Sequence, residues 1–333
     1  QKTAYEIKEC DWSSDVCSSD LKIAPHYSHP VVHVNDASRS VPVVSSLISD
    51  EQRSDFMNQV AMDYERIRKQ HAASRSTNRF ITIEEARRNH FQTDWDSLKF
   101  PVPTFTGVRV FDDLPLDEVV PFIDWTPFFH SWELKGSYPK ILKDPLKGNE
   151  AQKLFDDACQ MLNRIVAEKW IKAQAVVGFW KAYSSGDDIV VQNANGDEIV
   201  LHTIRQQTEK PSGMPNIALS DFVAPKGYHD FVGAFTVTAG GGVEERAKAF
   251  EAAHDDYSAI MLKALADRLA EALAEYMHLR TRKEFWAYAP DENLSGDELI
   301  AEKYRGIRPA PGYPAQPDHT EKITLFKIGR AHV

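Results

Sequence analysis

The chain passes once from helical sequence to a block of β-rich segments and back to helical sequence, and this order limits the folds open to it. The β-rich segments are residues 176–180, 189–191, 199–204 and 231–238. Asn195-Gly196, between the second and third, is a hairpin signal. Helices before and after hairpin-linked strands predict an α+β fold with a mostly antiparallel central sheet flanked by long helices.

The flanking segments carry helix signals of their own. Residues 50–74 repeat apolar side chains at helical spacing, and Thr82 to Glu85 read as a capping box for a following helix. After the strands, residues 244–280 form a long helical region with an apolar stripe made of Leu262, Leu265, Leu269, Leu273 and Tyr276. This stripe predicts one buried helix face.

The N-terminal part predicts a different kind of unit. Residues 31–34 form a short β-branched run, Asn35, Asp36 and Ser38 are capping candidates, and an apolar helix pattern continues to Ile48. One βα unit cannot form a domain, so we interpret residues 22–49 as the end of a Rossmann-like, doubly wound domain truncated upstream. The composition then changes to long, charged helix, which predicts a second domain over residues 50–327.

Both ends of the chain look foreign to the protein. DWSSDVCSSDL at residues 11–21 and IGRAHV at residues 328–333 match translations of the two strands of a common sequencing adapter. We therefore expect residues 1–21 and 328–333 to be artefacts that pack poorly or lie outside the fold. Excluding their three Asp residues and one Arg changes the formal charge from −10 to −8.

Composition excludes several classes of protein. After the ends are removed, Cys159 in a helical pattern is the one cysteine, which we expect to be a core thiol. This rules out a disulfide framework and a Cys-based zinc site, and it fits a reducing cytoplasm. An acidic chain without a long basic block predicts no nucleic-acid partner. No apolar run approaches the roughly 18 residues of a membrane span.

Motifs for metals and phosphate are weak. Neither HExxH nor CxxC occurs, and the histidines are scattered. Gly240 to Gly242 precede a helix in the position of a phosphate cradle, but Glu244 and Glu245 in its first turn would repel an anion. The sequence therefore predicts neither kind of site.

Asp124 stands out because it lies among aromatic residues in PFIDWTPFFHSW. It could cap the helix opened by Thr126-Pro127, or it could line an aromatic pocket suited to an ammonium or sulfonium cation. Glu271 lies off the leucine stripe with Asp267 and Glu275, which is typical of a solvated helix face. The remaining acidic candidate, Glu302, could simply pair with Arg305.

Residues 305–322, RGIRPAPGYPAQPDHTEK, contain four prolines around Gly312-Tyr313. Proline fixes φ and disfavours α geometry in the preceding residue, so this segment is a rigid loop. Such a loop can be an extended surface connector, or it can hold a ligand with little loss of entropy.

FIDWTPFF and residues 278–322 together resemble the C-terminal activation domain of cobalamin-dependent methionine synthase, and KIAPHYSHPVVHVNDASR resembles the last βα unit of that enzyme's cobalamin-binding domain. The resemblance covers almost all of residues 22–327. It implies that S-adenosylmethionine is bound by loop residues Arg308, Ala310, Gly312 and Tyr313, with Asp124 as the pocket carboxylate and with Glu271 and Glu302 as further acidic positions. Arg308 would form a forked pair with the ligand's carboxylate, and Gly312 would allow close backbone approach.

The same resemblance implies the activity. A methyltransferase of this family carries a methyl group from methyltetrahydrofolate to homocysteine, and this domain restores its inactive cob(II)alamin by reductive methylation from S-adenosylmethionine. The implied partners are the cobalamin-binding domain of the same chain and flavodoxin or an equivalent reductase. Cobalamin would be held mainly by the upstream domain, and zinc by the homocysteine domain of the full-length enzyme. No catalytic acid or base is implied.

Two departures from the family pattern and two rival functions stay open. Gln316 stands where many relatives have Cys, and the family segment that follows the loop is absent. A stand-alone S-adenosylmethionine sensor without turnover is the main alternative, although the βα unit at residues 22–48 argues against it. A hydrolase using Asp124 with Glu271 is the weaker one, because the sequence offers no nucleophile and base pair. We also expect an acidic redox partner to dock at residues 278–283 or 303–308, which are locally basic.

Overall fold

The computed structural model describes residues 23–27, 31–32, 37–76, 79–193 and 195–330. The chain divides into two compact units. Unit 1 comprises residues 1–93, 203–221 and 310–319, and unit 2 comprises residues 94–202, 222–309 and 320–333. The division into domains at residue 50 that the sequence suggests stays a prediction.

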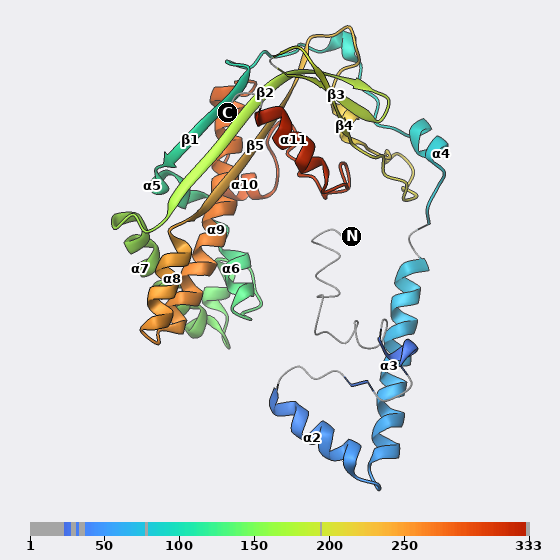
Figure 1. Ribbon diagram of the computed structural model, residues 1–333, viewed down its shortest axis with the longest axis vertical. Helices are drawn as coiled ribbons and strands as arrows, with labels where there is room; N and C mark the ends of the chain where they lie inside the picture. Colours follow the sequence, from blue (N-terminus) through green and yellow to red (C-terminus); the bar gives the residue numbers. More distant parts are fainter. Residues whose placement is uncertain (1–22, 28–30, 33–36, 77–78, 194, 331–333) are drawn as a thin grey trace. The chain divides into compact units, whose positions relative to one another are not determined.

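Unit 2 is built on a five-stranded antiparallel sheet whose central strand is β2 (Figure 1). Along one edge, β5 pairs with β2 from Lys172 to Ala182. On the other edge β1 pairs first and β3 follows, with β4 outside β3. The strands are β1 (Gly107–Leu114), β2 (Lys172–Ser185), β3 (Asp188–Gln192), β4 (Glu198–His202) and β5 (Asp230–Gly241). The predicted antiparallel sheet is therefore confirmed.

The hairpin between β3 and β4 forms where the sequence places it. Gly196 has φ +85°, a conformation that glycine adopts without strain. The Asn193 side chain accepts hydrogen bonds from the backbone N–H groups of Asn195 and Asp197, both at 2.9 Å. β4 ends at His202, two residues earlier than the sequence pattern suggests. β1 is a strand that the sequence reasoning did not identify.

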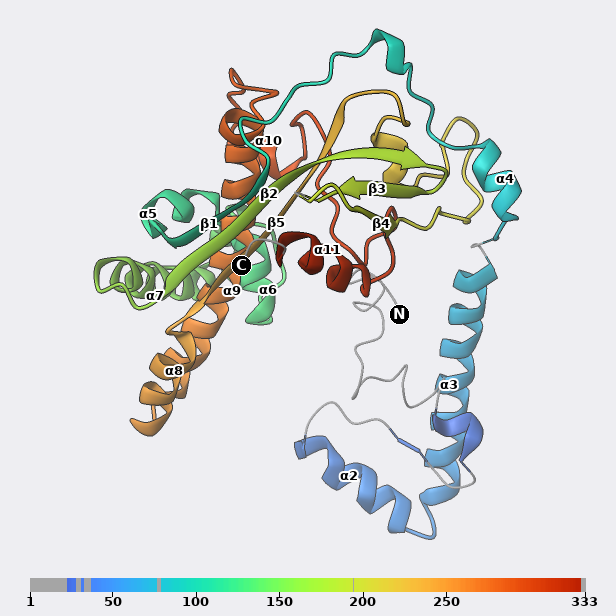
Figure 2. The ribbon, with the colours of Figure 1, turned by 45° about the horizontal axis from the view of Figure 1, so that its top comes forward.

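α9 (Asp256–Arg280) packs on β5 and β2, and four other helices of unit 2 pack against it (Figure 2). Those helices are α5 (Leu116–Val119), α6 (Trp125–Ser131), α7 (Gly148–Ala167) and α8 (Val243–Ala252). The predicted helical region 244–280 is thus two helices, separated at His254, whose φ of +58° is not helical. Beyond Arg280 the helix continues as a π-helical turn, Thr281–Phe285.

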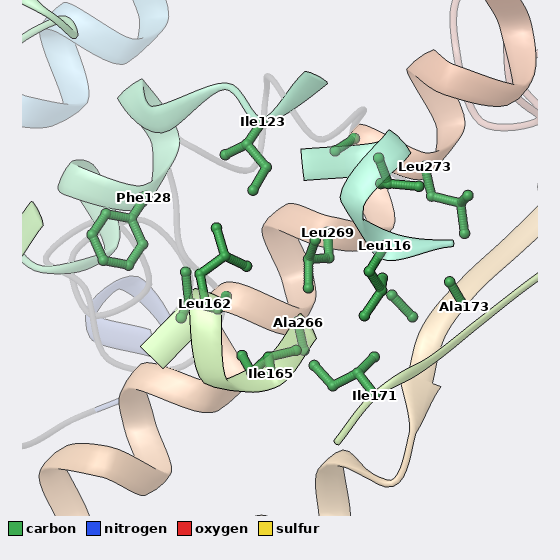
Figure 3. Close-up of a cluster of buried hydrophobic side chains, with 14 of the residues drawn as sticks. Leu116, Ile123, Phe128, Leu162, Ile165, Ile171, Ala173, Ala266, Leu269 and Leu273 are labelled. Atoms are coloured by element: carbon green, nitrogen blue, oxygen red, sulfur yellow. The ribbon is translucent and has the colours of Figure 1, made fainter. Parts of the chain in front are cut away.

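The core of unit 2 lies between these helices and the sheet. All five residues of the predicted stripe on α9 are buried. Figure 3 shows Leu269 and Leu273 of α9 facing Leu116 of α5, Ile165 of α7 and Ala173 of β2. Each fully buried leucine contributes roughly 1.5–3 kcal/mol of transfer free energy, so this interface stabilises unit 2. Shorter elements of the unit are η3 (Trp95–Ser97), η4 (Val120–Phe122), η5 (Lys140–Lys143) and α10 (Gly296–Ile300).

Unit 1 contains η2 (Ala24–His26), α2 (Ala37–Ile48), α3 (Arg53–Ser76), α4 (Ile83–Arg88) and η6 (Leu219–Phe222), whose last residue belongs to unit 2. The capping box is present: Glu85 N–H donates to the Thr82 hydroxyl at 3.2 Å, and Thr82 N–H donates to the Glu85 carboxylate at 2.9 Å. α2 confirms the expected helix, but the βα unit is not confirmed. Val31 and Val32 are not in a strand, while residues 33–36 lie outside the described part of the chain.

The C-terminal helix corrects one expectation about the ends. α11 (Glu321–Arg330) packs against β4, and Ile328 on this helix is only 1% exposed. A side chain buried to this degree is packed, so the expectation of poor packing is wrong for Ile328. Residues 1–21 and 331–333 lie outside the described residues, and the expectation for them stays a prediction.

Two further observations concern membrane-spanning helices and metal sites. No helix in the described ranges is long and apolar enough to cross a membrane. Among the same residues, no group of three or more His, Cys, Asp or Glu side chains is placed to hold a metal ion. Cys159 on α7 is half-buried rather than a core residue, and burial raises the pKa of its thiol.

Candidate functional site

Arg308, the residue that begins the proline-rich loop, is held by α9. Its Nη2 donates to Oε1 of Glu275, and each of the two side chains is about one quarter exposed, at 26% and 25%. Among the described residues, the ion-pair partner of Arg308 is thus Glu275 rather than Asp124, Glu271 or Glu302. An arginine in such a pair keeps its charge and a fixed direction.

The sequence suggested that Glu275 lies on a solvated helix face, but in the structure this residue is half-buried. Burial raises the pKa of its carboxyl, the charges of Arg308 and Arg282 oppose that rise, and the charge of Glu271 adds to it. Its second oxygen, Oε2, is buried and has no hydrogen-bond partner among the described residues. A buried carboxylate oxygen of this kind carries a desolvation cost that a donor would offset.

A second arginine, Arg282, lies seven residues after Glu275, where α9 continues as the π-helical turn. Arg282, in the π-helical turn, is 0% exposed and is bound by both oxygens of Glu292. Its guanidinium also lies 4.5 Å from the centre of the Tyr304 ring. Arg282 is therefore a core residue, and the hypothesis that it belongs to a surface patch for a redox partner is wrong.

His278 lies between Glu275 and Arg282 in the sequence and on the same helical face. Its imidazole contacts the Tyr304 ring edge-on, with the ring centres 4.7 Å apart. Burial lowers the pKa of His278 to about 3, and the charges of Arg282 and Arg308 add to the effect. His278 is neutral at physiological pH, because a third positive charge beside two guanidinium groups would be costly.

The sequence analysis did not assign these three residues of α9 and its extension to the ligand site, and it placed His278 and Arg282 in a docking patch instead. Glu275, His278 and Arg282 follow one another at intervals of three and four residues, which places them on one helical face. That spacing, on the side away from the leucine stripe, was the available signal. It could not show which of the polar side chains on the helix are covered by residues 288–308.

Three acidic residues, Asp124, Glu271 and Glu302, were predicted for the site. Among the described residues, none of the three forms an ion pair with Arg308. Glu271 is exposed on α9, one turn before Glu275. Glu302 is also exposed and has φ +53°, and its backbone N–H donates to the Leu299 carbonyl at 3.0 Å. It does not pair with Arg305, which donates to the Tyr288 carbonyl at 3.3 Å.

Asp124 is the N-cap of α6. Its Oδ1 accepts a hydrogen bond from the Thr126 N–H at 2.9 Å, and the residue itself is extended with φ −80° and ψ 113°. This is the capping role that the sequence left open as an alternative. The half-buried side chain has a second oxygen, so capping does not exhaust its capacity to accept hydrogen bonds.

Unit 1 contains the remainder of the loop, from Ala310 to His319. The Tyr313 N–H donates to the Ala310 carbonyl at 3.1 Å, and the Gln316 N–H donates to the Tyr313 carbonyl at 2.9 Å. Gly312 N–H in turn donates to the Gln316 carbonyl at 2.8 Å. These successive turns confirm a non-helical, hydrogen-bonded loop. The Tyr313 residue is 52% exposed, while Gln316 is 5% exposed.

Gly312 is required by its own surroundings. Its φ is +109°, and a Cβ at this position would collide with the imidazole of His319. The close approach that the sequence assigned to a ligand is made, in this structure, by a side chain of the same loop. Glycine at position 312 is therefore explained by loop packing alone.

A buried ion pair anchors the loop within unit 1. Arg205 and Asp221 are joined by two hydrogen bonds of 2.7 Å, and their side chains are 3% and 4% exposed. Next to Asp221, the Leu219 N–H donates to the Ala315 carbonyl at 2.9 Å. Residues 219–221 therefore contain both the acidic partner of the ion pair, Asp221, and the residue that binds the loop, Leu219.

Comparison with known proteins gives two findings. Residues 115–332 match the family described as vitamin B12 dependent methionine synthase, activation domain. A crystal structure of the MetH reactivation domain bound to AdoHcy is similar to this chain, with 51% sequence identity and a TM-score of 0.70 over 75% of this chain and 78% of the other. On this evidence the chain belongs to the family of activation domains of vitamin B12-dependent methionine synthase.

Proposed function

We propose that this chain binds S-adenosylmethionine and supplies it for reductive methylation of inactive cob(II)alamin in cobalamin-dependent methionine synthase. The observation that carries the proposal is the 51% identity to the MetH reactivation domain bound to AdoHcy. AdoHcy, S-adenosylhomocysteine, is what S-adenosylmethionine becomes when its methyl group is transferred. A domain similar to one that binds this product is a strong candidate for the same ligand.

The residues around Arg308 are suited to the amino-acid part of this ligand. A guanidinium has five N–H donors on three nitrogens, and Glu275 uses the Nη2 end of Arg308. A ligand carboxylate can then bind a different edge of the same group as a charge-assisted pair. Asp124, Glu271 and Glu302 are the proposed acidic partners for the positive groups of the ligand.

The loop residues that follow Arg308 are the proposed contacts for the rest of the molecule. Ala310 and Gly312 offer backbone groups, and Tyr313 offers a ring that is half exposed in this structure. Aromatic rings attract cations and stack on planar bases, so Tyr313 suits either the sulfonium or the adenine.

The work of this chain is binding and positioning. The sulfonium supplies an activated methyl group, because its leaving group is a neutral thioether. Holding two reactants in a fixed geometry can lower the barrier of a transfer reaction by several kcal/mol, roughly 7–11 in favourable cases. No residue of the chain is assigned as a general acid or base, since methyl transfer from a sulfonium needs neither.

The complete enzyme provides the remaining parts. Cobalamin is bound mainly by the cobalamin-binding domain of the same chain, and flavodoxin or an equivalent reductase donates the electron in the cytoplasm. Reactivation then restores methyl transfer from methyltetrahydrofolate to homocysteine, for which a homocysteine domain holds zinc. This chain contributes the S-adenosylmethionine site to that methyltransferase and would not be competent alone.

Calorimetric titration of the chain with S-adenosylhomocysteine tests the proposal. Arg308→Ala is expected to weaken binding by roughly 1.5–3 kcal/mol, the contribution of a charge-assisted hydrogen bond. Arg305→Ala is the matched control, because Arg305 is three residues away, is exposed and donates to the Tyr288 carbonyl rather than to Glu275. Equal losses in the two variants would refute the site, and a wild-type chain that binds no ligand would refute the function.

A further inference from the structure

Stability alone does not explain why the residue at position 275 is acidic. Its carboxylate is three-quarters covered, one of its oxygens has no hydrogen-bond partner among the described residues, and its pair with Arg308 spans 33 positions of sequence. A hydrophobic residue at position 275 would avoid the desolvation cost of a charge. The acidic residue must therefore do something that an apolar one cannot.

The pair joins a rigid element to a loop. The residues next to Glu275 on α9, Leu273, Tyr276 and Met277, are all buried, so the helix fixes where the carboxylate lies. Arg308 begins the proline-rich loop and carries a long side chain that loses about 2 kcal/mol of rotamer entropy when it is immobilised. Contact with a fixed carboxylate removes part of that freedom before any ligand binds.

We infer that Glu275 is a positioning residue, which holds the Arg308 guanidinium by its Nη2 end so that another edge is presented to the carboxylate of the ligand. This inference rests on the proposed function, because it assigns Glu275 a role in the same site. Glu275 does not touch the ligand. It raises affinity for ligands that carry a carboxylate and leaves affinity for ligands without one unchanged.

The test compares two ligands that differ in one group. S-adenosylhomocysteine has the carboxylate, and decarboxylated S-adenosylhomocysteine lacks only that group. Glu275→Gln keeps the shape of the side chain and removes its charge. We expect it to weaken binding of S-adenosylhomocysteine by roughly tenfold, the lower end for a charge-assisted hydrogen bond, and to change binding of the decarboxylated ligand by less than about twofold.

Three further variants separate positioning from a structural role. Asp267→Asn removes an exposed carboxylate two turns earlier on α9 and should leave both affinities unchanged. Glu275→Asp keeps the charge and should recover part of the preference for the carboxylate ligand. In an Arg308→Ala background, Glu275→Gln should have no further effect, because the residue acts through Arg308.

The outcomes are distinct. Equal weakening of both ligands by Glu275→Gln, or loss of the folded state in both Glu275 variants as measured by thermal unfolding, would show a structural role and overturn the inference. Tighter binding would show that Glu275 competes with the ligand for Arg308, which also overturns it. Either result leaves the proposed function standing, whereas a wild-type chain that fails to bind S-adenosylhomocysteine overturns both.

Discussion

Arg282 and Glu292 form a forked ion pair inside unit 2, with Arg282 Nη2 and Nε at 2.7 and 3.0 Å from Oε1 and Nε also 3.0 Å from Oε2. The Arg282 side chain is fully buried and that of Glu292 is 7% exposed. Two charges taken out of water to this extent stabilise the fold only while both are present. This pair ties the end of α9 to the segment that leads towards Arg308.

Arg282→Leu should therefore destabilise the protein by about 3–5 kcal/mol, because Glu292 would stay buried without its partner. Urea unfolding monitored by circular dichroism measures the change. The double variant Arg282→Leu/Glu292→Leu removes both charges and should recover most of the loss. A single variant as stable as the wild type would show that Glu292 reaches solvent in solution.

His278 should make the stability of the fold sensitive to acid. Its pKa is about 3 in the folded state against an ordinary value of 6.5, so between these pH values the unfolded chain binds more protons than the folded one. Stability contributed by neutral His278 is complete above pH 6.5 and is lost as the pH falls towards 3, by up to about 1.4 kcal/mol per pH unit. His278→Phe keeps an aromatic ring against Tyr304 and should flatten this part of the profile. An unchanged slope in unfolding free energy over that window would contradict the assignment.

Gly312→Ala should destabilise unit 1, because alanine disfavours a φ of +109° and its methyl group would meet the His319 ring. Backbone strain of this type costs about 1–3 kcal/mol before the collision is counted. Gly296→Ala is the matched control, since no atom lies within 4 Å of the added Cβ and its φ is not positive. Adding His319→Ala to Gly312→Ala should relieve the steric part, and no relief would mean that the ring is elsewhere in solution.

Asp124 combines a capping role with a proposed ligand role, and two substitutions distinguish them. Asp124→Ala removes the hydrogen bond to the Thr126 N–H and should cost about 1 kcal/mol of stability. Asp124→Ser keeps a capping oxygen and should unfold at nearly the wild-type temperature. If Asp124 also faces a positive group of S-adenosylmethionine, both variants should bind the ligand more weakly; wild-type affinity in Asp124→Ser would leave capping as its function.

The buried pair of unit 1 gives a local prediction. Asp221→Ala removes the carboxylate to which Arg205 donates two hydrogen bonds of 2.7 Å, and it removes the acceptor of the Ala218 N–H, which lies 3.0 Å from Oδ2. The neighbouring Leu219 N–H should then exchange with solvent faster, because its bond to the Ala315 carbonyl depends on the same segment. Native-state hydrogen exchange measures this, and unchanged protection of Leu219 would show that the loop is anchored by other contacts.

Local features of this protein were readable from short stretches of residues. The capping box at Thr82, the N-cap at Asp124, the Asn195-Gly196 hairpin and the leucine stripe of α9 all depend on neighbours within one or two turns. Strand β1 was not recognised, because its residues alternate only weakly between buried and exposed and their partners on β2 lie 59 to 72 positions later in the chain.

The site itself was decided by contacts between distant segments. From sequence, Asp267, Glu271 and Glu275 look alike on the polar face of one helix, and Arg280 and Arg282 look alike as basic residues. Folding covers Glu275 and Arg282 with Arg308, Glu292 and Tyr304, while Asp267 and Glu271 stay in solvent. Helical spacing specifies which side chains share a face, but burial depends on what packs over that face, and only the tertiary structure supplies it.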